Sequence, residues 1–176
     1  MKIKKIVFIA FVAIIGLVKV NAQENSYGIT AGYHMLSISV SGGGNTISTN
    51  ANGYFIGFFG EFNVSEKFNI QPEIHFASAY QDGENANEII VPIMAKYYVS
   101  EEFNVQAGPQ LDFIADESEG VNKFGLGLGF GAGYDISKKV FAAIRYSIGL
   151  SNRIQDAPSG ISSRFDTFQA GIGYRF

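Results

Sequence analysis

The segment from Phe124 to Ile136 constrains the fold more than any other part of this 176-residue chain. Apolar side chains stand at Phe124, Leu126, Leu128, Phe130, Ala132, Tyr134 and Ile136, and glycine stands at every position between 125 and 133 that separates them. Side chains alternate between the two faces of a strand, so one face is apolar and the other is bare. Five glycines on a face exposed to water would lower the β-propensity of the strand without any benefit. Inside a closed barrel, they leave room for large side chains from neighbouring strands. The pattern predicts a barrel strand with its apolar face outward.

The last twelve residues show the same two faces. Phe168, Ala170, Ile172, Tyr174 and Phe176 share one face, and Thr167, Gln169, Gly171, Gly173 and Arg175 share the other. The second face is small or polar, as the lumen of a membrane barrel requires. The chain is therefore expected to end on a strand that spans a membrane.

Eight alternating segments of suitable length cover the chain after its first residues: 27–38, 53–64, 68–80, 88–99, 103–114, 124–136, 140–150 and 165–176. Three connections are short (64–67, 99–102 and 136–139), and four are longer and polar (41–52, 81–87, 115–123 and 151–164). Short turns at one end and long loops at the other are typical of outer-membrane barrels. We expect an all-β fold, an eight-stranded antiparallel up-and-down transmembrane β-barrel, with no helix after residue 22. Pro72 and Pro109 interrupt strand segments and predict a bulge or bend at each.

Residues 1–22 have the pattern of a cleaved signal peptide. Lys2, Lys4 and Lys5 precede the apolar run 6–18, and Val20 and Ala22 suit a signal peptidase cutting before Gln23. The run is shorter than the roughly 20 residues of a membrane anchor. We therefore expect a signal peptide at 1–22 and a barrel domain at 23–176.

The charge and the cysteine content limit the kinds of partner and anchor that this chain can have. Removal of the four lysines of residues 1–22 leaves nine of the 13 basic residues against 16 acidic ones, a net charge of −7. A nucleic acid partner needs a clustered basic face, so none is expected. The chain has no cysteine, which excludes disulfides and a lipid anchor on cysteine.

The strand register directs a polar set into the lumen. Its members are Thr30, His34, Glu61, Glu73, His75, Lys96, Gln106, Gln110, Asp112, Arg145, Gln169 and Arg175, with Phe55, Phe59 and Phe141 as bulky neighbours. Eight strands leave a lumen that side chains just fill. Buried charges need partners, so Glu61, Glu73, His75, Lys96, Asp112, Arg145 and Arg175 are predicted to form a lumen network of carboxylate–cation pairs.

Three functions suit such a lumen. The first is a structural or interaction role with a largely plugged, polar lumen. The second is a narrow channel for ions or small solutes, lined by the same charged residues. The third is an enzyme that modifies outer-membrane lipids, which needs a nucleophile beside a base. Ser37 and Ser78 fall at uncertain or outward positions relative to His34 and His75, so we expect no enzyme and no catalytic residue. The two histidines and Glu73 lack tight ligand spacing, so no metal or other cofactor is expected.

The polar loops offer a separate surface. Asp82, Glu84, Asp116, Glu117 and Glu119 make two of them acidic. They suit either plain solvation, or cation bridging to lipopolysaccharide or adhesion to a protein. The fold alternative is a soluble secreted barrel of lipocalin type, which also has eight strands.

Several segments resemble one protein family. "IQPEIHFASAY" at 70–80, "AGPQLDFIA" at 107–115, "IRYSIGLSNR" at 144–153 and "GIGYRF" at the end are similar to the PorT-like, porin-family outer-membrane β-barrel domain of Bacteroidetes. The resemblance implies location in a Gram-negative outer membrane, in contact with its lipid and lipopolysaccharide. It also implies that Tyr174 and Phe176 form the C-terminal signal read by the barrel-assembly machinery. It implies no particular activity.

Overall fold

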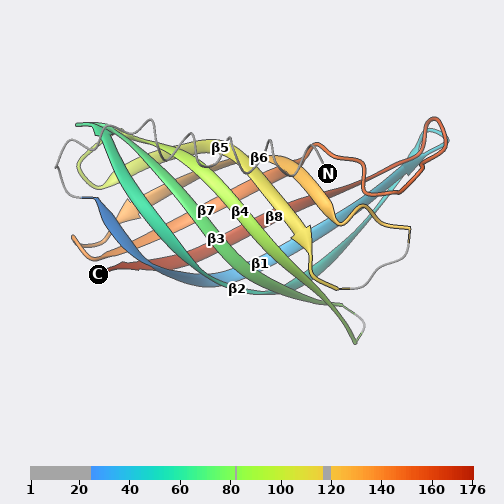
Figure 1. The fold of residues 1–176 in the computed structure, drawn as a ribbon, viewed down its shortest axis with the longest axis horizontal. Helices are drawn as coiled ribbons and strands as arrows, with labels where there is room; N and C mark the ends of the chain where they lie inside the picture. The colour runs from blue at the N-terminus through green and yellow to red at the C-terminus, as the bar shows by residue number, and fades with distance from the viewer. Residues whose placement is uncertain (1–24, 82, 117–119) are drawn as a thin grey trace, which may run out of the picture.

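The computed structural model describes residues 25–81, 83–116 and 120–176, and these form one closed barrel (Figure 1). Its strands are β1 (Ser26–Gly42), β2 (Asn45–Ser65), β3 (Phe68–Gln81), β4 (Glu84–Tyr98), β5 (Phe103–Ile114), β6 (Phe124–Asp135), β7 (Val140–Gly149) and β8 (Ser162–Arg175). Every strand pairs antiparallel with its sequence neighbours, and β1 pairs with β8 to close the ring. The predicted eight-stranded barrel is confirmed. The predicted signal peptide, 1–22, lies outside the described residues.

Both ends of the described chain lie at one end of the barrel, which we call the terminal end. The Phe176 N–H donates to the Tyr27 carbonyl oxygen at 3.0 Å there. The turns 66–67, 99–102 and 136–139 lie at the same end, and the other four connections lie at the opposite, loop end. In the described ranges, no helix is long and apolar enough to cross a membrane.

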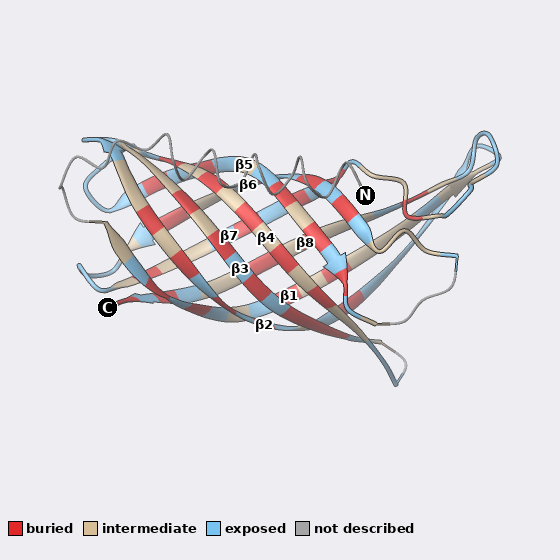
Figure 2. Cartoon of the chain, in the orientation of Figure 1, coloured by how far each residue is buried: buried red, intermediate tan, exposed pale blue. Residues whose placement is uncertain are grey.

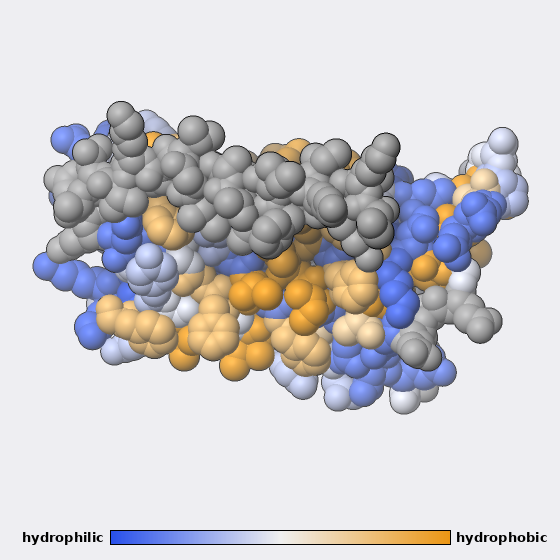
Figure 3. Space-filling view, in the orientation of Figure 1, coloured by the Kyte–Doolittle hydropathy of each residue, from blue (hydrophilic) through white to orange (hydrophobic). Residues whose placement is uncertain are grey.

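The two faces of each strand differ in the way that β6 predicts. Its glycines at 125, 127 and 129 are buried, whereas Phe124, Leu126, Leu128 and Phe130 are exposed. Figure 2 shows this alternation of buried and exposed residues along the strands. Exposed isoleucine, leucine, phenylalanine and tyrosine side chains cover the outside, and Figure 3 shows an apolar band between two polar ends. An apolar band of this kind is expected of a surface in contact with lipid, and it would be unfavourable in water.

The predicted loop at 41–52 is wrong. β1 runs to Gly42 and β2 starts at Asn45, so only Gly43 and Gly44 form the turn, both with positive φ (59° and 82°). Two such residues make the hairpin turn whose twist matches that of the strands. The polar residues of this segment pair across the hairpin instead: Ser39 Oγ lies 2.8 Å from Ser48 Oγ. Polarity suggested a loop, but β-pairing needs no apolar side chain.

The predicted loop at 81–87 is also wrong, for the same reason. β3 ends at Gln81 and β4 begins at Glu84, with Gly83 (φ 89°) in the turn. The predicted alternation of short turns and long loops therefore fails for two of the four connections at the loop end. The strands themselves are longer there.

Neither proline produces a bulge, which was one of the two distortions expected there. The register is the same on both sides of Pro72 in the β3–β4 ladder, and on both sides of Pro109 in the β4–β5 ladder. Pairing is interrupted beside each, because proline lacks an N–H to donate. The register shift that does occur lies between Asn63 and Ser65 in the β2–β3 ladder.

Candidate functional site in the barrel lumen

The lumen is filled by buried polar side chains from every strand except β6, whose inner positions are glycines. The twelve polar residues directed inward by the sequence pattern are all buried, as are Phe55, Phe59 and Phe141. Thr167, placed on the inner face of the last strand by the same alternation, is buried as well. The chain also buries polar residues that the pattern did not single out: Gln71, Ser78, Glu88, Asn104, Ser147, Arg153 and Ser163. Ser78 was expected at an uncertain or outward position. It is buried between Ala77 and Ala79, so both faces of β3 are covered at this level.

The first group of charges lies toward the terminal end, and we call it the Glu61 cluster. Lys96 Nζ lies 3.1 Å and Arg175 Nη2 lies 3.2 Å from Glu61 Oε2. Arg175 Nη2 also lies 2.8 Å from Asp135 Oδ1. Two carboxylates therefore meet two cations, and the cluster is balanced in charge. Buried ions in such an arrangement are compensated by one another instead of by water.

Neutral groups complete this cluster. The Asn69 side-chain amide donates to Glu61 Oε1 at 2.6 Å. Tyr98 Oη lies 3.2 Å from Glu61 Oε1 and 3.0 Å from Asp135 Oδ2. Tyr98 and Asp135 were not among the residues predicted for the lumen network, although the alternation within 88–99 and 124–136 places both on the inner face. A groove of about 440 Å³ at the mouth of the barrel is lined in part by Asn69 and Tyr98.

The second group, the Glu73 cluster, lies deeper. Arg145 Nη2 donates to Glu73 Oε1 at 2.6 Å, and His75 Nε2 lies 2.6 Å from Glu73 Oε2. Gln71 donates to the same carboxylate at 3.1 Å and accepts from Lys96 Nζ at 2.9 Å. Gln71 thus links the two clusters, which makes one hydrogen-bonded network across the lumen.

A third ion pair closes the lumen toward the loop end. Arg153 Nη2 donates to Asp112, which was predicted inward without a specific partner. The Arg153 guanidinium also stacks on the Phe165 ring, 4.5 Å from its centroid. Arg153 follows β7, in the segment expected to be a polar loop, so strand periodicity could not point to it.

One buried pair is poorly satisfied. His34 Nε2 lies 3.7 Å from Glu88 Oε2, and both residues are almost fully buried. Neither side chain forms a hydrogen bond with any described residue. Glu88 is therefore a buried carboxylate without the cation that each of the other three has.

Aromatic side chains occupy the space that glycines leave. The Phe141 ring lies against Gly173 so closely that a Cβ there would overlap it. Arg175 and Lys96 stack on this ring, 4.7 and 5.3 Å from its centroid, and the Phe59 ring meets it edge-on at 5.3 Å. Small residues on one strand thus accommodate large ones on the next, as expected for a narrow barrel.

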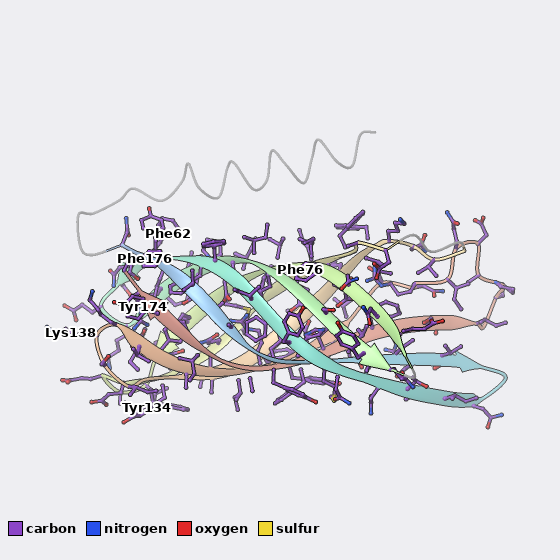
Figure 4. All side chains as sticks on the ribbon, turned by 90° about the horizontal axis from the view of Figure 1, so that it is seen from below. Phe62, Phe76, Tyr134, Lys138, Tyr174 and Phe176 are labelled. Carbon is purple, nitrogen blue, oxygen red and sulfur yellow. The ribbon has the colours of Figure 1, made fainter. Side chains whose placement is uncertain are left out.

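The outer surface carries aromatic residues at the terminal end. Figure 4 shows Phe62, Tyr134, Tyr174 and Phe176 pointing outward there, near Lys138. Tyr174 and Phe176 pack edge to face with ring centroids 6.2 Å apart. Such aromatic girdles mark the level of the membrane interface.

At the loop end, Asp82, Glu117 and Glu119 lie outside the described residues. Asp116 accepts hydrogen bonds from the Asn87 backbone N–H at 2.7 Å and from its side-chain amide at 3.0 Å. These bonds hold the pKa of the Asp116 carboxyl below its usual value. Within the described ranges, no group of three or more histidine, aspartate or glutamate residues is placed to hold a metal ion.

The sequence was compared with protein families, with curated proteins and with solved structures. A family model described as "Outer membrane protein beta-barrel domain" matches residues 7–176. No curated protein matches the sequence.

Solved structures share the fold. Ail, the attachment invasion locus protein of Yersinia pestis, superimposes with a TM-score of 0.56 at 13% identity, over 88% of this chain and 100% of Ail. Its complex with the heparin analogue sucrose octasulfate gives 0.51 at 16% identity over the same shares. Neisserial surface protein A gives 0.50 at 12% identity, over 88% of this chain and 100% of that one. At these identities the likeness establishes the architecture.

Proposed function

Because the chain belongs to the outer membrane protein β-barrel family and is thus an integral protein of the outer membrane, we propose that it acts there as a structural or interaction protein with a closed lumen. The terminal end faces the periplasm and the loop end faces outside, as in barrels with short periplasmic turns. One observation carries this proposal. The ion pairs of Glu61, Glu73 and Asp112 occupy the lumen at successive levels, and Gln71, which is almost fully buried, links the first two.

A conducting path would need water and mobile ions at these levels. Each charged group of the Glu61 and Glu73 clusters is already within hydrogen-bond distance of an opposite charge. An ion could pass only if these pairs opened, and opening a buried pair costs about 3–5 kcal/mol when its partner is lost. This favours a plug over a pore.

Planar-bilayer recording tests the proposal. The purified protein is expected to give no discrete current steps. The informative variants are Glu73→Gln, in the lumen, and Ile144→Ala, on the lipid face of β7 beside Arg145. Steps in the parent protein that change in Glu73→Gln and persist in Ile144→Ala would establish the narrow channel instead.

We also propose that the protein is not an enzyme. The support is that His75 is almost fully buried and its Nε2 atom lies 2.6 Å from Glu73 Oε2, so this histidine has no access to lipid outside the barrel.

We further propose that the chain belongs to the PorT-like branch found in Bacteroidetes, on the motifs at 70–80, 107–115 and 144–153. The expected partners are outer-membrane lipid, lipopolysaccharide and the assembly machinery, with Tyr174 and Phe176 as the recognition signal and residues 1–22 as the export signal.

A further inference from the structure

Three strands continue past the rest of the barrel at the loop end. Ser41 pairs with Thr46 on β2 and with Ser162 on β8, so β1 is the middle strand of a small sheet. We call this the outer sheet; it comprises residues 37–42, 45–51 and 162–166. Figure 1 shows its β1–β2 hairpin projecting well beyond β5, β6 and β7.

The two edges of the outer sheet differ in their backbone hydrogen bonds. At the β8 edge, the Arg153 N–H donates to the Ser163 carbonyl at 2.8 Å, and the Ser163 N–H donates to the Asn152 side chain at 2.9 Å. At the β2 edge, pairing with β3 stops at Asn52 and Tyr80, because the chain turns back after Gln81. From Asn45 to Ala51, no backbone hydrogen bond joins this edge to any described residue. One edge is covered and the other is open.

The open edge presents a regular row of backbone groups. The two-residue turn is closed by a hydrogen bond from Asn45 back to Gly42, so the peptide groups of Asn45, Ile47 and Thr49 face β1. The peptide groups alternate in direction along a strand, so the N–H and C=O groups of Thr46, Ser48 and Asn50 face away. Among the described residues, this side of the strand is unpaired over about 24 Å, at about 3.4 Å per residue.

None of the usual protections of an edge strand is present. Proteins guard such edges with charged residues, proline, bulges or short length. Between Met35 and Gly60 the chain has no charged residue and no proline, and the β1–β2 register has no shift. An edge with these properties is a template for an added strand.

The side chains of the outer sheet indicate which kind of strand could bind at the open edge. The face of the outer sheet that continues the lumen carries Ile38, Val40 and Ile47, of which Ile47 is 74% exposed, whereas Ser39 and Ser48 lie on the other face. A strand added antiparallel to β2 continues the line of β3 and begins beside the exposed carboxylate of Glu84. A basic group at the start of that strand would complement this charge.

We propose that the edge Asn45–Ala51 binds an extended segment of another polypeptide by strand addition, and that this segment alternates apolar and polar residues after a basic one. The inference rests on the outward orientation of the loop end in the proposed function. A second copy in the same membrane is a poorer occupant, because both copies run this edge in the same direction and cannot pair antiparallel.

The test uses the full-length protein in detergent and a labelled synthetic peptide in which a lysine precedes alternating valine and threonine over the length of the edge. Fluorescence anisotropy should show saturable binding. Ser48→Pro removes an outward N–H without touching the hydrogen bonds to β1, and is expected to weaken binding about tenfold or more. Ser48→Ala keeps the N–H and should bind like the parent.

A second peptide keeps the test independent of that variant. N-methylation at the alternate residues that face β2 blocks the ladder, and this peptide should not bind. Equal binding by Ser48→Pro or by the methylated peptide would overturn strand addition, as would failure of the unmethylated peptide to saturate. A concentration-dependent dimer that Ser48→Pro abolishes would identify a second copy as the occupant and reject our assignment. None of these results depends on whether the lumen conducts, which the bilayer recording decides separately.

Discussion

At the scale of single residues, two of the three buried glutamates of the lumen, Glu73 and Glu88, have very different partners. Glu73 is 6% exposed and is held by Arg145, His75 and Gln71. Glu88 is 1% exposed, has His34 at 3.7 Å and accepts no hydrogen bond from a described residue. A buried charge is stabilising only when it is paired and hydrogen-bonded. The same substitution at the two positions should therefore have different effects on the stability of the barrel.

Glu73→Gln is expected to destabilise the barrel by about 3–5 kcal/mol, because it leaves the Arg145 guanidinium buried without its carboxylate. Glu88→Gln should leave the stability unchanged or raise it, because a neutral amide costs less to bury than an unpaired carboxylate. Equilibrium unfolding in urea, in lipid vesicles, measures both. A loss for Glu88→Gln as large as that for Glu73→Gln would show that Glu88 has a partner of comparable strength.

At the scale of the element, β6 shows what a strand requires when lipid covers one face and packed side chains the other. Its inner positions are glycines because neighbouring strands fill the space: a Cβ on Gly125 would meet the Arg153 guanidinium, and one on Gly133 would meet Asn104 and Gln106. Its outer positions are exposed and apolar, from Phe124 to Tyr134. The depth of each outer residue in the membrane follows from its distance to the strand ends.

Phe130→Arg and Tyr134→Arg test this depth dependence on one face of β6. Phe130 lies near the middle of the strand, where an arginine facing lipid costs about 2–4 kcal/mol. Tyr134 lies at the terminal end, in the aromatic girdle, where the cost falls to about 0–1 kcal/mol. Unfolding free energies in lipid vesicles should separate the two variants. Equal costs would mean that this face is not embedded as described.

At the scale of the whole molecule, closure of the sheet satisfies the backbone without water. All eight strands are paired on both sides through the body of the barrel, and the apolar surface forms a band between polar ends. In hydrocarbon an unpaired backbone group costs several kcal/mol, so only a closed sheet can span it. The open edge of the outer sheet lies beyond this band, where water can satisfy its peptide groups.

The assembled barrel should behave as a membrane protein and not as a soluble barrel of lipocalin type. Extraction from the cell envelope is expected to require detergent, and the unheated protein should migrate differently from the boiled protein on a denaturing gel, because the closed sheet resists unfolding until heated. Release of the protein by buffer alone, with no such shift, would return the soluble barrel to consideration.

The sequence by itself determined the strands, their two faces and the closed, membrane-embedded class. Alternation with a period of two is local, and it assigns Glu61, Glu73 and Arg175 to the lumen before any partner is known. It could not assign Arg153, which lies in a predicted loop, and it gave no partner for Tyr98 or Asp135. It also read the polar segment 41–52 as a loop, although β-pairing extends through it.

Only the tertiary structure decided which buried groups meet. Asp112 and Arg153 are brought together over Gly125 of β6, Glu61 and Arg175 meet because β1 closes the sheet between their strands, and Glu88 accepts no hydrogen bond from a described residue. The tertiary structure also decides the length of each strand relative to its neighbour. Because β2 begins beyond the end of β3, the edge Asn45–Ala51 is open. These features depend on the strand register and on the closure of the sheet. Both are set by many contacts between segments that are distant in the sequence, so the alternation within one strand cannot predict them.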